Sequence, residues 1–310
     1  MGKYSAALPQ LGDVYLGDGG LETVLIFHKN LDLPLFAACD LLRTPEGTAT
    51  LREYFDEMAQ IADRAGVGFV LDTATWRSNP DWTDQLGYSH EEFVEINRAA
   101  VRLALDIRDH WERDLPIPIA GVVGPRGDGY RPDRLQSVDE AREYSSNQIS
   151  VLAEAGVDFI SALTLNYTAE AAGIALAARD AGIPAVISFT VETDGKLVTG
   201  DTLEEAIAFV DGATGSYPAY YMVNCAHPTH LPDDLASGAP WALRVRGFRA
   251  NASSLSHAEL DEAEELDDGD VEELTRQAGE LHLAAPQLTV WGGCCGTDKR
   301  HLEAIARAIA

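Results

Sequence analysis

Three cysteines have the residue type and the spacing of a metal site. Cys294 and Cys295 are adjacent in a glycine-rich segment, 292–296, which directly follows an apolar, strand-like run at 288–291. Side chains of neighbouring residues point to opposite sides of an extended backbone, so both sulfurs can face one point only if the flanking glycines permit a sharp turn. Cys225 ends another strand-like run. Three thiolates from two strand ends suit Zn²⁺ with a fourth position left for a substrate, which is typical of a catalytic site.

Other interpretations of these cysteines remain open. Adjacent cysteines can form a strained disulfide, or both can be small buried hydrophobic residues. The glycines, the strand-end position and the partner Cys225 favour the metal site. His227 and His230 follow Cys225 closely, and we expect them to lie around the ligands or in a loop, because three ligands are already present. Cys39 has no ligand set around it, and we expect a small, at least partly buried residue.

Length and composition indicate a globular protein. The 310 residues fit one large α/β barrel. No run of about 18 apolar residues predicts a membrane span, and the N-terminus lacks an apolar signal segment. Four cysteines are too few for a disulfide scaffold in a chain of this length, which predicts a reducing, cytoplasmic location.

The charge of the chain limits its partners. The net charge is −27, with 50 acidic residues and only four lysines. Such a surface repels phosphate, so we expect no nucleic-acid partner. The same field favours small cationic molecules.

Strand-like and helix-like segments alternate along the chain. Repeated βα units of this kind predict an α/β protein with a single (β/α)8 TIM barrel over residues 1–310, whose chemistry lies on the loops after the strands. A doubly wound sheet is the alternative, but it usually has fewer strands, and no Gly-x-Gly-x-x-Gly or P-loop follows the first strand. The expected strands are 14–16, 68–71, 117–123, 159–163, 185–189, 219–223, 242–248 and 288–291, and the expected helices are 47–65, 90–112, 138–155, 168–181, 202–211, 270–284 and 298–309.

Three motifs resemble those of the homocysteine S-methyltransferase family. They are Asp18-Gly19-Gly20, Val223-Asn224-Cys225 and the segment Gly292 to Thr297, in the family's order and approximate spacing. The resemblance implies a barrel that holds Zn²⁺ on Cys225, Cys294 and Cys295. It also implies methyl transfer from a cationic donor to the thiol of homocysteine, which gives methionine. The chain length resembles the S-methylmethionine branch more than the betaine branch.

The resemblance also suggests substrate contacts. Asp18 is expected to hold the amino group of the acceptor, although an Asp before two glycines can simply form a turn. Phe36 and Trp76 are candidates for an aromatic cage around an onium donor, with core packing as the alternative. Further polar groups expected at the rim are Glu22, Asn224 and Asn251.

One position departs from the family pattern. Leu163 stands where relatives carry a Glu that helps to bind the substrate amine. With Asp18 as the remaining carboxylate, we expect only a modest preference for homocysteine over a thiol without the amino group, below about tenfold. A different thiol acceptor is therefore an alternative. A second alternative is a non-catalytic metal- or redox-sensing barrel. The acidic run 259–270 is expected to be a solvated helix or loop.

Overall fold

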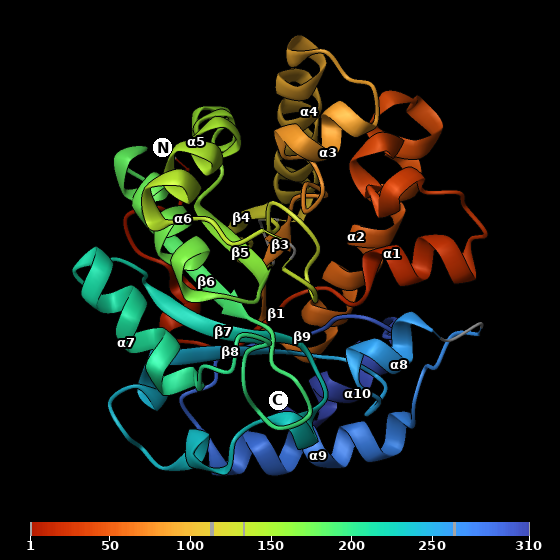
Figure 1. Cartoon of the computed structure of the whole chain (residues 1–310). Coiled ribbons are helices and arrows are strands. Elements are labelled where there is room, and N and C mark those ends of the chain that lie inside the picture. Colours follow the sequence, from red (N-terminus) through yellow and green to blue (C-terminus); the bar gives the residue numbers. More distant parts are fainter. Residues whose placement is uncertain (1, 112–114, 133, 263–264, 310) are drawn as a thin grey trace.

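The computed structural model describes residues 2–111, 115–132, 134–262 and 265–309. Its strands form a ring in which every neighbouring pair is parallel, and the helices lie around the outside (Figure 1). Among the described residues the strands are β1 (Tyr15–Leu16), β2 (Gly68–Phe69), β3 (Leu71–Asp72), β4 (Ile119–Val123), β5 (Phe159–Leu165), β6 (Ala185–Phe189), β7 (Tyr220–Ala226), β8 (Val245–Ala250) and β9 (Val290–Gly293).

The ring closes through a split second strand. The sheet runs in the order β2-β1-β9-β8-β7-β6-β5-β4-β3, and only Val70 separates β2 from β3. The Val70 amide donates to the Leu16 carbonyl at 2.7 Å, and the next amide, of Leu71, donates to Pro118 at 3.0 Å. The segment 68–72 therefore bonds to β1 on one side and to β4 on the other. Counting it as one strand gives the eight strands of the predicted (β/α)8 barrel, and that prediction is confirmed.

Helices of regular amphipathic sequence cover the ring (Figure 1). The first long one begins at Thr44, whose side chain accepts from the Gly47 amide at 3.0 Å, and ends at Gly66 in the left-handed conformation, where glycine is favoured. The described helices are α1 (Leu21–Thr23), α2 (Pro45–Ala65), α3 (Pro80–Gln85), α4 (His90–Trp111), α5 (Val138–Ala155), α6 (Thr168–Asp180), α7 (Leu203–Thr214), α8 (His257–Asp261), α9 (Val271–Ala284) and α10 (Lys299–Ile309), with short 3-10 or π turns at Pro9–Leu11, Val24–His28, Pro34–Phe36, Ala38–Arg43, Pro228–His230, Asp233–Ala236 and Ala242–Arg244.

The expected strand 242–248 begins three residues later than its apolar pattern indicated, the largest such difference. Residues 242–244 form a 3-10 turn, and β8 starts at Val245. The Arg244 guanidinium donates to the Asp211 carboxylate at 3.0 Å and to the Pro218 carbonyl at 2.8 Å. These bonds hold residue 244 in the 3-10 turn, and the strand begins at the next residue.

Side chains fill the inside of the barrel. A buried cluster that includes Phe159, Tyr220, Met222 and Val290 occupies the interior, as expected for a barrel whose centre is a packed core. A larger cluster lies between the strands and the helices. In the described part of the chain, no helix is long and apolar enough to cross a membrane.

Candidate metal and substrate site

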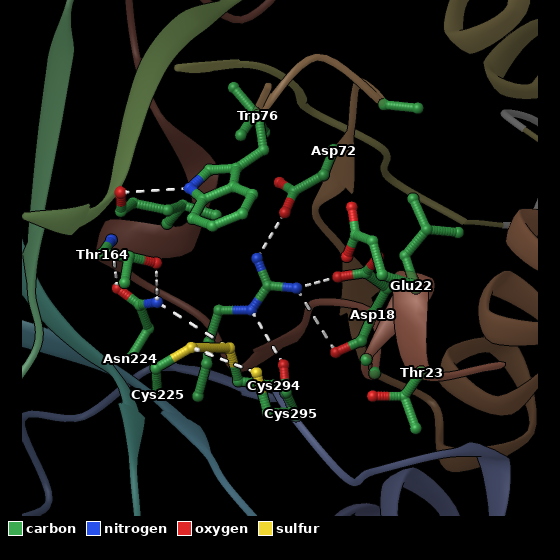
Figure 2. A pocket seen from close by; sticks show the side chains of 18 of the residues that line it. Asp18, Glu22, Thr23, Asp72, Trp76, Thr164, Asn224, Cys225, Cys294 and Cys295 are labelled. Atoms are coloured by element: carbon green, nitrogen blue, oxygen red, sulfur yellow. Dashed lines mark hydrogen bonds and ion pairs between the residues drawn. A yellow bond between two sulfur atoms is a disulfide. The ribbon is translucent and has the colours of Figure 1, made fainter. Parts of the chain in front are cut away.

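The three predicted cysteines meet at the carboxyl ends of the strands. Cys225 lies near the end of β7, and the other two directly follow β9. Their sulfurs all lie within 4.8 Å of one another. Cys225 and Cys294 are joined by a disulfide, and the Sγ of Cys295 lies 3.8 Å from that of Cys225 (Figure 2).

Backbone geometry at both strand ends explains how the sulfurs converge. Cys225 has a φ of 53°, and the pairing of β7 with β8 shifts register beside it. The Cys294 amide still donates to Ala250, at 2.7 Å, but its carbonyl accepts from both the amide and the hydroxyl of Thr297. The chain therefore turns immediately after β9. Gly20 must lack a side chain here, since a Cβ would stand 2.4 Å from the Cys294 carbonyl oxygen. The predicted turn is confirmed.

The residues present fit a Zn²⁺ ion. Tetrahedral Zn–S bonds of about 2.3 Å place the ligand sulfurs about 3.8 Å apart, which is the observed separation of Cys225 and Cys295. The Tyr130 hydroxyl lies 3.3 Å from the Cys225 sulfur and 3.6 Å from that of Cys295, and the Asn224 amide nitrogen lies 3.8 Å from the Cys294 sulfur. Such donors stabilise ligand thiolates. The disulfide and the metal-bound form exclude each other, because zinc is bound by thiolates.

A cavity of about 330 Å³ opens beside the sulfurs. Five of the six predicted substrate-binding residues line it together with the cysteines: Asp18, Glu22, Phe36, Trp76 and Asn224. Asn251 does not belong to this lining; the oxygen of its side-chain amide is buried and accepts no hydrogen bond from the described residues. The cavity is large enough for a small molecule next to the three cysteines.

The carboxylate of Asp18 is occupied by the protein itself. Its Oδ1 forms an ion pair with the Arg249 guanidinium, which also pairs with Asp72 (Figure 2). Its Oδ2 accepts from the Tyr54 hydroxyl at 3.3 Å. All three ionic side chains are less than 10% exposed. Burial lowers the pKa of Arg249 to about 10, so its guanidinium stays charged at neutral pH.

The predicted aromatic cage already surrounds a cation. The Arg77 guanidinium lies over the rings of Trp82, Trp76 and Phe36, at 4.2, 5.1 and 5.8 Å from their centroids. Its Nη1 donates to the Leu35 carbonyl at 2.7 Å. Arg77 also lines the cavity, so this wall presents a guanidinium held by aromatic faces.

Asn224 and Leu163 also belong to the cavity lining. The Asn224 side chain is fixed by Ser188, by the amide of Thr164 and by the hydroxyl of Thr164, at 2.6 to 2.8 Å. Asn224 therefore positions the strand ends next to Cys294 and has little freedom to turn toward a substrate. Leu163 lines the cavity at 9% exposure, and its carbonyl accepts from the Trp76 indole at 3.4 Å.

Three residues of the site were not predicted as binding residues. In the sequence, Arg249 belongs to the polar segment expected at the rim after the strand 242–248, but it was not a predicted binding residue; Arg77 and Tyr130 were not singled out. A signal existed for both: Arg77 follows the singled-out Trp76, and Tyr130 lies in a Gly-rich loop after the third barrel strand, where barrel sites are built.

The remaining cysteine and the histidines lie outside the thiolate cluster. Cys39 is buried, with its sulfur 3.6 Å from the Arg77 carbonyl. His227 bonds the Thr229 hydroxyl at 2.8 Å, and His230 bonds the Ser254 carbonyl at 3.0 Å. They are loop residues, as expected.

The acidic run 259–270 is only partly solvated. Glu259 caps α8 through Ser256, and residues 263–264 lie outside the described part of the chain. The Asp267 carboxylate accepts from the Ser253 hydroxyl, and Asp268 pairs with Arg300 at 2.6 Å. This segment is thus attached to the rim by its acidic side chains.

Glu22 is a carboxyl group of the cavity lining whose ionisation is altered by burial. Desolvation raises its pKa from the usual 4.5 to about 7, although Arg77 acts in the opposite direction. The folded protein therefore holds this proton more tightly than the unfolded chain. The stability that Glu22 contributes is fully present below pH 4.5 and is lost as the pH rises through 7.

Replacing Glu22 by Gln tests this linkage. We expect the variant to match the wild type in thermal stability near pH 5 and to exceed it at pH 8, because Gln carries no charge that must be desolvated. Melting temperatures at both pH values check the result. Glu143→Gln, at an exposed site on α5, is the matched control and should show no such difference. A wild-type advantage at pH 8 would contradict the assignment.

The fold and the site define a class of protein: a parallel eight-strand barrel with a three-cysteine candidate metal site at the carboxyl ends of its strands. The family model described as homocysteine S-methyltransferase matches residues 15–309. The chain therefore belongs to the homocysteine S-methyltransferase family, which confirms the resemblance inferred from the three motifs.

Individual relatives are similar over most of the chain. Homocysteine S-methyltransferase 1 of Arabidopsis thaliana is 24% identical, with 99% of this chain and 98% of the relative aligned. Homocysteine S-methyltransferase 4 of Zea mays is 26% identical over 97% of this chain and 90% of its own length. The metallated form of the homocysteine methyltransferase MmuM from Escherichia coli has a TM-score of 0.75 at 22% identity, covering 97% of this chain and 98% of that one. This structural likeness supports the fold.

Proposed function

We propose that the protein is a zinc-dependent S-methyltransferase that moves a methyl group from a cationic donor to a small-molecule thiol. The observation that carries the proposal is the convergence of the Cys225, Cys294 and Cys295 sulfurs at the edge of a cavity. Family membership supports homocysteine as the reference acceptor, an S-methylmethionine-like sulfonium or a betaine-like ammonium as donor, and methionine as product.

The reaction needs an ionised thiol. A free thiol has a pKa near ~8.5 and is mostly protonated at neutral pH. Cys225, Cys294 and Cys295 would hold Zn²⁺, and the bound ion would favour the thiolate form of a substrate sulfur. A lone pair of that sulfur forms the new S–CH3 bond while the bond from the methyl group to the donor sulfur or nitrogen breaks, and its electron pair leaves with the neutral donor product.

The protein side chains create the environment for this charge cancellation. Transfer from a cation to an anion disperses charge, so exclusion of water favours the transition state over the solvated reactants. Trp76, Phe36 and Leu163 supply apolar walls to the cavity. Tyr130, through its hydroxyl beside two of the sulfurs, is placed to orient and stabilise the thiolates.

Two further candidates each have an observation in their favour. A different thiol acceptor is favoured by Leu163, and by Asp18 being paired with Arg249. A metal- or redox-sensing role is favoured by the disulfide between Cys225 and Cys294.

A screen of thiols against methyl donors tests the proposal. The reduced, zinc-loaded protein is incubated with S-methylmethionine, betaine or a methylfolate and with a set of thiols that includes homocysteine, and methylated products are measured by mass spectrometry. We expect methyl transfer from a cationic donor, loss of transfer after chelation, and recovery when zinc returns. If no thiol is methylated although one zinc is bound per chain, the methyltransferase proposal is contradicted and the metal- or redox-sensing role is favoured.

A further inference from the structure

We propose that the acceptor selected by this cavity is a thiol that carries a carboxylate but no neighbouring ammonium group, and that Arg77 binds the carboxylate. The inference rests on the proposed function and narrows its acceptor. Two observations in one cavity carry it: the Asp18 carboxylate is already paired with Arg249, and the Arg77 guanidinium has no carboxylate partner within 4.0 Å among the described residues.

The acidic site is already filled by a cation. Both carboxylate oxygens of Asp18 are engaged, one by Arg249 and the other by the Tyr54 hydroxyl. The same guanidinium also holds Asp72 and donates to the Gly293 carbonyl at 3.3 Å. An ammonium group brought to Asp18 would have to displace a buried guanidinium or stand beside it, and like charges in a desolvated site repel strongly.

Leu163 offers no replacement carboxylate. Leu163 presents an apolar side chain, and its carbonyl is used by the Trp76 indole. A substrate ammonium against this wall would lose water without gaining an acceptor, which costs free energy.

Arg77 supplies the complementary charge. Rings lie around its guanidinium, and one nitrogen donates to the Leu35 carbonyl. Among the described residues, its side chain makes no ion pair within 4.0 Å, in contrast to Arg249. The carboxylates of Asp128 and Glu22 interact with the Arg77 guanidinium electrostatically, from beyond ion-pair distance. A partly buried guanidinium with unused N–H donors is the group that binds a carboxylate best.

Arg77 and the sulfurs face the same space. The Arg77 side chain and the three cysteines all belong to the lining of one cavity. A short thiol with a carboxylate at its far end can therefore place sulfur at the cysteines and oxygen at Arg77. Glu22 and Asp128 are the competing groups, because their side chains belong to the same cavity lining and each carboxylate could pair with an ammonium.

Three thiols of similar length separate these possibilities. Homocysteine has both charged groups, 4-mercaptobutyrate lacks the ammonium, and 3-mercaptopropylamine lacks the carboxylate. Binding of each to the reduced, zinc-loaded protein is measured by isothermal titration calorimetry, which requires no donor. We expect 4-mercaptobutyrate to bind at least as tightly as homocysteine, and 3-mercaptopropylamine to bind at least about tenfold more weakly.

Arg77 variants assign the carboxylate contact. Arg77→Gln should weaken 4-mercaptobutyrate by about tenfold or more and leave 3-mercaptopropylamine nearly unchanged, while Arg77→Lys should retain part of the affinity as a point charge. Arg244→Gln is the matched control, since Arg244 also lies over a ring, that of Tyr221, but at the opposite end of the barrel. If Arg77→Gln fails to fold, the wild-type series of three thiols still decides the question.

Each outcome has a distinct meaning. Homocysteine binding more than about tenfold tighter than 4-mercaptobutyrate would overturn the inference and leave the proposed function intact, with Glu22 or Asp128 as the ammonium partner. An Arg77→Gln variant that loses affinity for the methyl donor but not for 4-mercaptobutyrate would overturn it as well. Failure of all three thiols to bind would instead remove the proposed function.

Discussion

Replacing any one of Cys225, Cys294 and Cys295 by alanine is expected to weaken zinc binding by more than about 100-fold and to abolish methyl transfer. Loss of a residue that merely orients a metal ligand already costs 10–100-fold in affinity, and removing a ligand is more severe. The three sulfurs lie within 4.8 Å of one another, so no single cysteine is peripheral. Zinc content by elemental analysis, after reduction and reloading, measures the effect.

Cys39→Ala is the control for this series. Its thiol is buried away from the cluster, so zinc content should remain at one ion per chain. Oxidation of the wild type should release the metal, and a reductant should restore binding, because a disulfide sulfur cannot serve as a thiolate ligand. Full zinc content in all three variants of the cluster would remove the basis of the proposed metal site.

Replacing Arg249 by Leu should lower the free energy of unfolding by about 3–5 kcal/mol, because it leaves buried carboxylates without their partner. The guanidinium and both carboxylates are less than 10% exposed, so solvent cannot compensate. Adding Asp18→Asn and Asp72→Asn to Arg249→Leu should recover a large part of the loss, since the neutral trio has no unpaired charge. Urea unfolding followed by circular dichroism gives the values.

An exposed arginine provides the comparison. Arg276 pairs with Glu273 and Glu280 on the surface of α9, and Arg276→Leu should cost less than about 1 kcal/mol, as is usual for exposed pairs. Equal losses for Arg276→Leu and Arg249→Leu would show that burial does not determine the effect. If the triple variant did not recover stability, unpaired buried charge would not be the cause of the loss in Arg249→Leu.

The sequence predicted the barrel and the thiolate cluster because both depend on short-range patterns. Apolar runs followed by amphipathic helices identify βα units, and the glycines around Cys294 and Cys295 identify the turn that brings their sulfurs together. Under the barrel prediction, Cys225 reaches the same rim without any further information.

The charged contacts could not be predicted in this way. Arg249 reaches Asp72 across 177 residues and Asp18 across 231, and no local pattern selects these partners among the polar groups of the rim. Phe36 and Trp76 were correctly placed on the cavity wall. What their rings face was not foreseen, because the neighbouring side chain of Arg77 turns back over them.

The long-range ion pairs of Arg249 also bear on the order in which the chain folds. Asp18 follows β1, Asp72 ends β3 and Arg249 belongs to β8, so the trio forms only when the first and the late strands have met. Contacts between such distant segments carry a large loop-closure entropy and are made late. Interactions absent from the transition state mainly slow unfolding. The two pairs are therefore expected to contribute chiefly to the lifetime of the closed barrel and of the charged cavity at its rim.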